Sequence, residues 1–138
     1  MSEWHIRSAT VSDIDAVLSF WAGSDAIPSS TDNPAALGRL IEEFDGLLLA
    51  ERDSAIVGTL IATWDGWRGN MYRLVVDRRH RRQGIALALV AAGERRLAER
   101  GCHRLCALVM NAHEHAVRFW TAAGYSGDPA MTRHVKMI

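Results

Sequence analysis

Apolar residues recur at intervals of three and four positions in two segments near the start of the chain, and this spacing is typical of amphipathic helices. The first segment begins at Thr10-Val-Ser-Asp13, a sequence that favours the start of a helix. Its apolar positions are Ile14, Val17, Leu18 and Trp21. We therefore predict a helix here that buries one face.

A second helix is predicted after a polar stretch. Residues 23–33 are rich in Ser, Asp and Pro, which indicates a loop. Pro34 then suits the first turn of a helix, because its fixed φ fits that turn and its missing N–H is not needed there. We expect Gly46 to end this helix. Its inward face is expected to consist of Leu37, Leu40, Ile41 and Phe44.

The pattern then changes to extended, largely apolar runs. Residues 47–51 and 55–64 read as strands joined by the hairpin-like turn Arg52-Asp53-Ser54. A second turn, residues 65–69, leads into a third strand over residues 71–76. These three runs predict a sheet with antiparallel connections.

The second half of the chain alternates between helical and extended patterns. A long helix is predicted from Gly84 to Arg100, with Gly101 as its stop, followed by a strand over 104–110, a short helix over 114–122 and a last strand from Met131. The apolar face of the long helix is expected to contain Leu87, Val90, Ala91 and Leu97. Core or cleft-wall positions are expected for Trp64, Trp67, Phe119 and Trp120. The sequence thus predicts one α+β domain over residues 1–138.

Composition and charge narrow the class of protein. The chain has 138 residues, of which 49% are hydrophobic and 23% charged, as in an ordinary globular domain. Sixteen basic residues balance sixteen acidic ones, which argues against a nucleic-acid partner. No signal peptide or membrane span is evident, and the two cysteines, Cys102 and Cys106, do not form a disulfide framework. We therefore expect a cytoplasmic protein without a metal site.

A local basic run lies between the third strand and the long helix. It reads Arg78-Arg79-His80-Arg81-Arg82 and is followed by Gln83 and Gly84. The N-terminus of a helix exposes unpaired N–H groups, and glycine allows an anion to approach the backbone closely. The arginines would add charge-assisted hydrogen bonds. This position favours a site for a phosphorylated ligand over the two alternatives, a solvated charge run and an RNA-contacting patch.

A wider set of motifs carries a family resemblance. The hexapeptide Arg81-Arg82-Gln83-Gly84-Ile85-Ala86 matches the pattern Arg/Gln-x-x-Gly-x-Gly/Ala, and it matches neither a Walker loop nor the three-glycine dinucleotide motif. Leu74-x-Val76 precedes it, and Ala116-x-x-Phe119-Trp120-x-x-x-Gly124-Tyr125 follows. Together these segments resemble the GNAT family of N-acetyltransferases, in particular its small single-domain bacterial members. The resemblance is most specific between Tyr72 and Tyr125.

The resemblance implies a three-layer fold and a co-substrate. A central, mixed, mostly antiparallel twisted sheet would be flanked by about four helices. Acetyl-CoA would lie where two parallel strands splay apart, here residues 71–76 and 104–110. Its pantetheine arm would pair with backbone groups of Leu74, Val75 and Val76. The residues whose backbone N–H groups would hold the pyrophosphate are Arg81, Arg82, Gln83, Gly84, Ile85 and Ala86.

The implied reaction is direct attack of a primary amine on the thioester carbonyl. The backbone N–H of Val75 or Val76 would stabilise the developing oxyanion, and Tyr125 would protonate the departing CoA thiolate. A lysine-like ammonium, with a pKa of roughly 10.4, must first lose a proton. The candidate bases, among which the sequence makes no choice, are Glu51, Asp65 and His113.

Several points stay open at this stage. His113 stands where the family frequently has asparagine, and Asn111 lies two residues too early, so we expect His113 to take that polar role near the cofactor. The acceptor is a primary amine of a small molecule or of a peptide or protein. A homodimer is compatible with the apolar final segment. The alternative from another class is a catalytically silent acyl-CoA-binding or sensing module on the same fold.

Overall fold

The computed structural model describes residues 3–138, and the chain divides into two compact units. The first comprises Met1–Leu108 and the second Val109–Ile138, and each is described by itself. The expectation of one domain over residues 1–138 stays a prediction.

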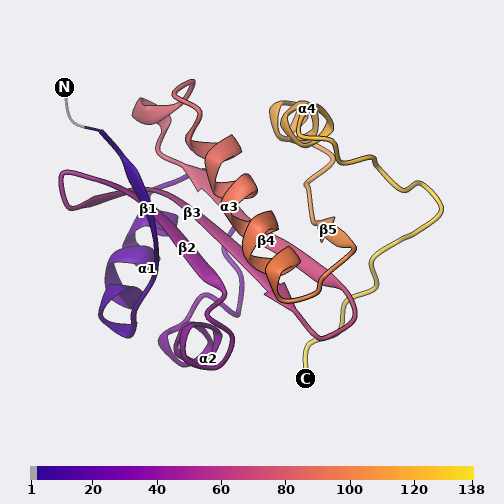
Figure 1. The fold of residues 1–138 in the computed structure, drawn as a ribbon, viewed down its shortest axis with the longest axis horizontal. Coiled ribbons are helices and arrows are strands. Elements are labelled where there is room, and N and C mark those ends of the chain that lie inside the picture. The colour runs from indigo at the N-terminus through magenta and orange to yellow at the C-terminus, as the bar shows by residue number, and fades with distance from the viewer. Residues whose placement is uncertain (1–2) are drawn as a thin grey trace. The chain divides into compact units, whose positions relative to one another are not determined.

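A five-stranded sheet forms the centre of the first unit (Figure 1). Its strands lie in chain order across the sheet. They are β1 (His5–Ser8), β2 (Leu47–Arg52), β3 (Ala55–Trp64), β4 (Gly69–Val76) and β5 (Leu105–Ala107). Neighbouring strands are antiparallel except β4 and β5, which are parallel. The sheet is therefore mixed and mostly antiparallel, as predicted.

Helices cover both faces of this sheet (Figure 1). They are α1 (Ile14–Ala22), preceded by the 3₁₀ turn η1 (Val11–Asp13), α2 (Pro34–Phe44) and α3 (Ile85–Glu99). Alternate residues of β2 point to opposite faces, so Leu47 and Leu49 pack in one buried cluster with residues of α1 and α2. On the other face α3 approaches β3 closely at Gly58, where an added Cβ would lie 3.1 Å from side-chain atoms of Ile85 and of Leu89. The α+β class is confirmed.

The helical and hairpin predictions hold over most of their length. Asn33 caps α2 by accepting a hydrogen bond from the N–H of Ala36 at 2.9 Å, and Pro34 occupies the first helical position. In the β2–β3 hairpin, Asp53 and Ser54 both have positive φ, which is typical of a two-residue turn that matches strand twist.

Other expectations are wrong. No strand is formed from Met131 onward, and the strand expected over 104–110 is limited to β5. Phe44, Leu87 and Ala91, expected inside, are exposed, and Trp67 has 73% of its surface exposed. The buried face of α3 is rotated from the expected one and consists of Ile85, Leu89, Val90, Gly93 and Leu97. The strand β1 was missed because its four residues are too few for a pattern.

The second unit contains one helix, α4 (Glu114–Ala122). Trp120 is its buried residue, and its ring makes edge contacts with Phe119 and with Tyr125, whose ring centroids lie 5.5 and 4.9 Å away. Tyr125 thus takes part in the aromatic packing of this unit. Over residues 3–138 no helix is long and apolar enough to cross a membrane.

Candidate functional site

The pairing of the two parallel strands stops partway along β4. Gly69, Asn70 and Met71 pair with β5, and the N–H of Leu108 donates to the Met71 carbonyl at 3.4 Å. Strand β4 continues to Val76. In the described register, residues 74–76 of β4 therefore have no strand partner on the edge that faces away from β3. Unpaired main-chain groups at such an edge are free to pair with an extended ligand.

A β-bulge interrupts β4 on its other side. Tyr72 lies opposite Ile61 and Val75 opposite Thr59, so two residues of β4 oppose one residue of β3. The first of these two is Arg73, whose φ of 54° lies in the left-handed region. A non-glycine residue pays about 1–2 kcal/mol for this conformation, and such residues cluster at functional sites.

Buried contacts hold the bulge in place. The Thr59 hydroxyl donates a hydrogen bond to the Arg73 carbonyl at 2.9 Å and accepts one from Trp21 Nε1 at 2.9 Å. The Arg73 guanidinium pairs with Asp32 at 2.5 Å and lies over the Trp21 ring, 5.1 Å from its centroid. Both the main chain and the side chain of Arg73 are therefore anchored to the layer that contains α1.

The turn after β4 leads into the N-terminus of α3, which has no side-chain cap. Asp77 begins the 3₁₀ turn η2 (Arg78–His80) by accepting a hydrogen bond from the N–H of Arg79 at 3.1 Å. Burial raises the pKa of Asp77, but hydrogen bonds from Arg79 outweigh that effect, and the pKa lies below its usual value. Gly84 takes the N-cap position of α3 with a φ of 81° and offers no side chain to cap the helix. The first N–H groups of α3 are therefore open to an anion.

A carboxylate from a distant loop contacts two arginines of this turn. Asp25, between α1 and α2, accepts hydrogen bonds from Arg78 at 2.6 Å and from Arg81 at 3.3 Å. The Arg81 hydrogen bond, with help from Arg78, holds the pKa of Asp25 below its usual value. All these side chains are substantially exposed, so solvent weakens the ion pairs. The arginines remain accessible to a phosphate.

The comparisons with known proteins decide the family. Residues 14–125 match the model of the acetyltransferase (GNAT) family. The chain belongs to the GNAT family. It is therefore an acetyl-CoA-dependent acetyltransferase, in agreement with the resemblance of its motifs.

Curated relatives and solved structures agree with this assignment. An acetyltransferase of Photorhabdus laumondii is 34% identical over 75% of this chain and 73% of its own. One of Pectobacterium atrosepticum is 29% identical over 96% of this chain and 95% of its own. The structure of the aminoglycoside N-acetyltransferase AAC(6')-Iy with CoA has a TM-score of 0.77 at 19% identity and covers 100% of this chain and 97% of that one. Ard1 from Thermoplasma volcanium has a TM-score of 0.79 at 21% identity and covers 89% of this chain and 82% of that one.

The structure brings most residues expected to hold the co-substrate to one corner of this GNAT domain. Leu74, Val75 and Val76 lie on the part of β4 beyond its pairing with β5, and residues 81–86 form the turn and first helical positions that follow. Their binding roles stay predictions. His113 and Tyr125 lie in the second unit, where His113 precedes α4 and stacks on His115, so their roles stay predictions too.

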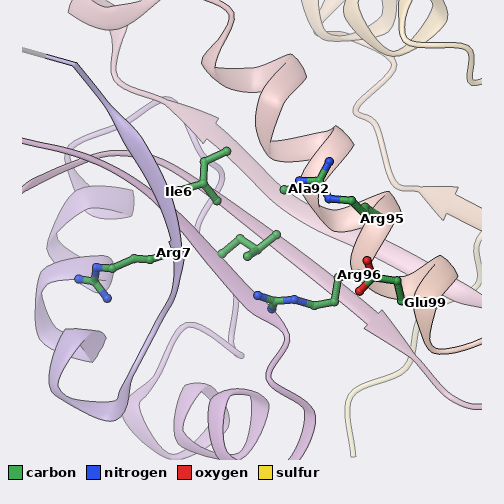
Figure 2. Close-up of a pocket in the computed structure, with 7 residues that line it drawn as sticks. Ile6, Arg7, Ala92, Arg95, Arg96 and Glu99 are labelled. Atoms are coloured by element: carbon green, nitrogen blue, oxygen red, sulfur yellow. The ribbon is translucent and has the colours of Figure 1, made fainter.

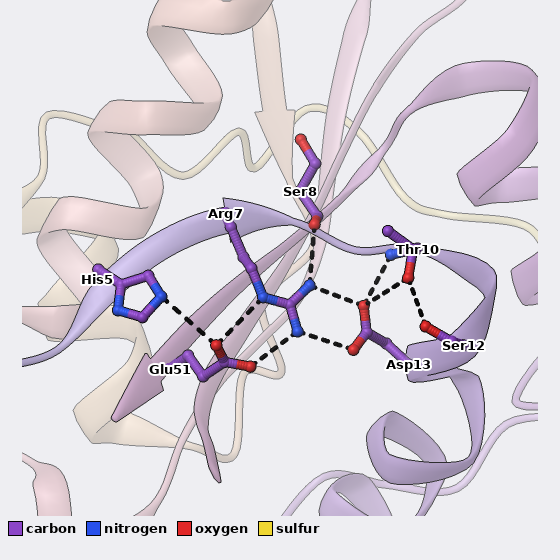
Figure 3. Close-up of polar contacts among 7 residues, drawn as sticks. All are labelled: His5, Arg7, Ser8, Thr10, Ser12, Asp13 and Glu51. Carbon is purple, nitrogen blue, oxygen red and sulfur yellow. Dashed lines mark hydrogen bonds and ion pairs between the residues drawn. The ribbon is translucent and has the colours of Figure 1, made fainter. Parts of the chain in front are cut away.

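Two of the candidate bases are held as carboxylates by structural contacts. Hydrogen bonds from Arg7 lower the pKa of Glu51, which lies on β2 and contacts His5 as well (Figure 3). The N–H groups of Arg68 and Trp67 lower the pKa of Asp65 in the β3–β4 turn. A general base works best with a pKa near the working pH, so both residues are poorly suited to that role.

Sequence reasoning missed the residues that support the bulge. Thr59, Asp32 and Trp21 come from β3, the α1–α2 loop and α1, and they meet Arg73 only in the folded chain. No local motif marks them. The one signal was Thr59 itself, a hydroxyl inside an apolar strand, which must find buried partners.

A separate pocket lies over the opposite part of the sheet (Figure 2). It is formed by β1, β2 and α3, and Figure 2 shows Ile6 facing the helix residues Ala92 and Arg96. Arg96 is engaged there with the carbonyl of Asp45 at 2.7 Å and with the hydroxyl of Ser8. Because β1 and β2 lie at the far side of the sheet order from β4, this pocket is distinct from the candidate site.

Proposed function

We propose that this GNAT acetyltransferase transfers the acetyl group of acetyl-CoA to a primary amine by direct attack. The observation that carries the proposal is the combination at one corner of the first unit: a strand edge without a strand partner, followed directly by an uncapped helix N-terminus. The edge suits the extended pantetheine arm, and the helix start suits a diphosphate.

The co-substrate contacts follow from this arrangement. The main chain of Leu74, Val75 and Val76 pairs with the pantetheine arm as an added strand would. The N–H groups of residues 81–86 bind the diphosphate, and Arg78 and Arg81 exchange Asp25 for phosphate oxygens.

The chemistry requires three events at the thioester. The amine nitrogen, once deprotonated, forms a bond to the carbonyl carbon, whose oxygen takes the negative charge and accepts a hydrogen bond from the main chain of β4. The carbonyl reforms as the carbon–sulfur bond breaks. The CoA thiolate leaves and takes a proton from Tyr125, the general acid in this proposal. The nitrogen of the new amide loses its extra proton to solvent water, and solvent returns a proton to Tyr125. The products are an amide and free CoA.

The acceptor class is supported by the named neighbours. Structures with this fold include an aminoglycoside N-acetyltransferase and a ribosomal-protein-alanine N-acetyltransferase of Brucella melitensis, which is 18% identical with a TM-score of 0.74. Both names specify amine acceptors, one a small molecule and one a protein. We propose a primary amine of either kind for this chain, and a cytoplasmic homodimer as its working form.

A transfer assay tests the proposal. Release of CoA is followed with an amine panel of aminoglycosides, polyamines and peptides with free N-termini. We expect turnover with at least one amine, and a roughly 10- to 100-fold lower kcat in Tyr125→Phe, because the leaving thiolate loses its proton donor.

The matched control is Phe119→Tyr, which adds a hydroxyl to another aromatic ring of the same unit, whereas Tyr125→Phe removes one. Binding of acetyl-CoA without turnover on any amine would instead support the silent acyl-CoA-binding module. The molar mass of the protein in solution tests the homodimer.

A further inference from the structure

Thr59 is the single buried polar residue among residues 3–138, with 0% of its surface exposed. Its hydroxyl contacts two groups, the indole nitrogen of Trp21 and the carbonyl oxygen of Arg73, both at 2.9 Å. The indole N–H can only donate, and a carbonyl oxygen can only accept. The Thr59 hydroxyl must therefore accept from Trp21 and donate to Arg73, so the direction of this hydrogen-bond chain is fixed.

This chain determines the orientation of one peptide group in β4. The carbonyl of Arg73 points toward Thr59 on β3. In a trans peptide the N–H of the next residue points the opposite way, and no peptide bond among residues 3–138 is cis. The N–H of Leu74 is thus directed away from β3, toward the edge of β4 at residues 74–76, which do not pair with β5.

The neighbouring residue has the opposite orientation. Asp77 donates its N–H to the Val57 carbonyl on β3 at 2.8 Å. Hydrogen-bonded pairs recur at every second residue of an antiparallel ladder, so Val75, which lies opposite Thr59, also directs its N–H toward β3. Adjacent residues of an antiparallel strand direct their N–H groups to opposite sides, so the outward direction of the Leu74 N–H agrees with the inward direction of the Val75 N–H.

We propose that Thr59 is a positioning residue for acetyl transfer. Its hydroxyl, oriented by Trp21, aims the Leu74 N–H at the position where the thioester oxygen becomes negatively charged. The inference rests on the proposed function, and it assigns the oxyanion donor to Leu74, whereas the sequence led us to expect Val75 or Val76. Preorganised donors of this kind lower the barrier because they need no reorientation during the reaction.

The anchoring of the Arg73 side chain supports the same role. Its guanidinium is held by Asp32 and by the Trp21 ring, and its backbone remains in the left-handed region at a φ of 54°. Trp21 therefore contacts both ends of the device: its nitrogen orients the Thr59 hydroxyl, and its ring supports the side chain of Arg73. These contacts keep a strained peptide in one orientation.

The test compares Thr59→Val with Thr59→Ser. Valine has nearly the shape of threonine but cannot donate to Arg73, whereas serine keeps the hydroxyl. The first readout is the infrared stretch of the carbonyl in acetyl-CoA labelled with ¹³C at that carbon, because a hydrogen bond to this oxygen lowers its frequency. The second readout compares the change in kcat with the change in the Kd for CoA in each variant. CoA has no acetyl group and therefore does not contact the Leu74 N–H.

We expect bound acetyl-CoA to show a lowered carbonyl frequency in the wild type and in Thr59→Ser. In Thr59→Val we expect much of that shift to be lost, together with a roughly tenfold or greater fall in kcat, while the Kd for CoA stays within about twofold. Thr63→Val, a hydroxyl deletion elsewhere on β3, is the matched control and should leave both readouts unchanged.

Two results would overturn the inference. An unchanged carbonyl shift and kcat in Thr59→Val, with a loss of stability alone, would limit Thr59 to a structural role. Equal losses of kcat and CoA affinity would show that the whole site is disturbed. If Thr59→Val does not fold, Trp21→Phe carries the test. It removes the N–H that orients the hydroxyl, together with part of the ring that supports Arg73, and we expect it to reduce the carbonyl shift in part. Failure of the wild type to bind acetyl-CoA would overturn the proposed function as well.

Discussion

At the scale of single residues, the main network of ion pairs joins side chains that are far apart in the sequence and meet only in the folded chain. Arg7 on β1 is the centre of the densest network (Figure 3). It donates to Asp13 at 2.8 Å through two nitrogens and to Glu51 at 2.8 Å. Asp13 in turn accepts from the N–H of Thr10 at 2.8 Å, so the network connects β1, η1 and β2. Its role is structural, because β1 and β2 lie at the opposite end of the sheet order from β4 and β5.

This network makes stability depend on pH. The Arg7 hydrogen bond lowers the pKa of Asp13 from 3.8 to about 2, and it lowers the pKa of Glu51 too. Between these values the unfolded chain binds more protons than the folded one, so the stabilisation is complete above about pH 5 and is lost as the pH falls toward 2. We expect the free energy of unfolding in urea to fall by on the order of 1 kcal/mol over this range because of Asp13.

The control variants isolate the cause. Asp13→Asn should lower stability at pH 7 and flatten the loss between pH 5 and pH 2. Asp15→Asn, an exposed aspartate in the first turn of α1, should behave like the wild type. An acid loss of the same size in Asp13→Asn would contradict the role given to the Arg7 contact.

At the scale of elements, the sequence pattern predicted those features that depend on interactions between residues close together in the chain. The start of α2 at Pro34, the β2–β3 hairpin and the strand–turn–helix around Gly84 were all evident, because each depends on residues a few positions apart. The end of α2 lies slightly earlier than the expected Gly46, because Asp45 takes the left-handed C-cap position. Strand β1 and the bulge in β4 were not, because they depend on partners 40 or more residues away or on a register that the sequence does not specify. The exposed face of α3 was misjudged, since alanines and leucines occur all around this helix.

The start of α3 carries an element-scale prediction. Gly84 has a φ of 81°, and an added Cβ would meet no heavy atom within 4 Å. The cost of Gly84→Ala therefore comes from the backbone alone, about 1–2 kcal/mol of unfolding free energy. Any relief of this strain would reorient the N–H groups of residues 84–86, so we expect CoA affinity to fall by about tenfold or more.

Gly127→Ala is the matched control, since an added Cβ there also meets nothing and its φ is not in the left-handed region. Calorimetric titration with CoA and urea unfolding check both variants. Full CoA affinity in Gly84→Ala would show that the conformation of this residue is not needed for binding.

At the scale of the whole molecule, the fold brings residues from distant segments next to the proposed site on β4. The motif residues from Leu74 to Ala86 are contiguous in sequence, which is why the sequence alone located this corner and its family. The supporting residues Trp21, Asp32 and Thr59 lie in three earlier elements and reach β4 only through the sheet and its α1 face. Sequence therefore predicts the main-chain part of the proposed site, and the structure adds the residues that we propose to position it.

The most direct test of this account is an amide NMR titration of the ¹⁵N-labelled protein with CoA. The account predicts that the largest shift changes fall on the amides of residues 74–76 and 81–86, at the end of β4 and the start of α3. Changes concentrated on β1, β2 and the middle of α3, around the pocket of Figure 2, or no changes at saturating CoA, would contradict it.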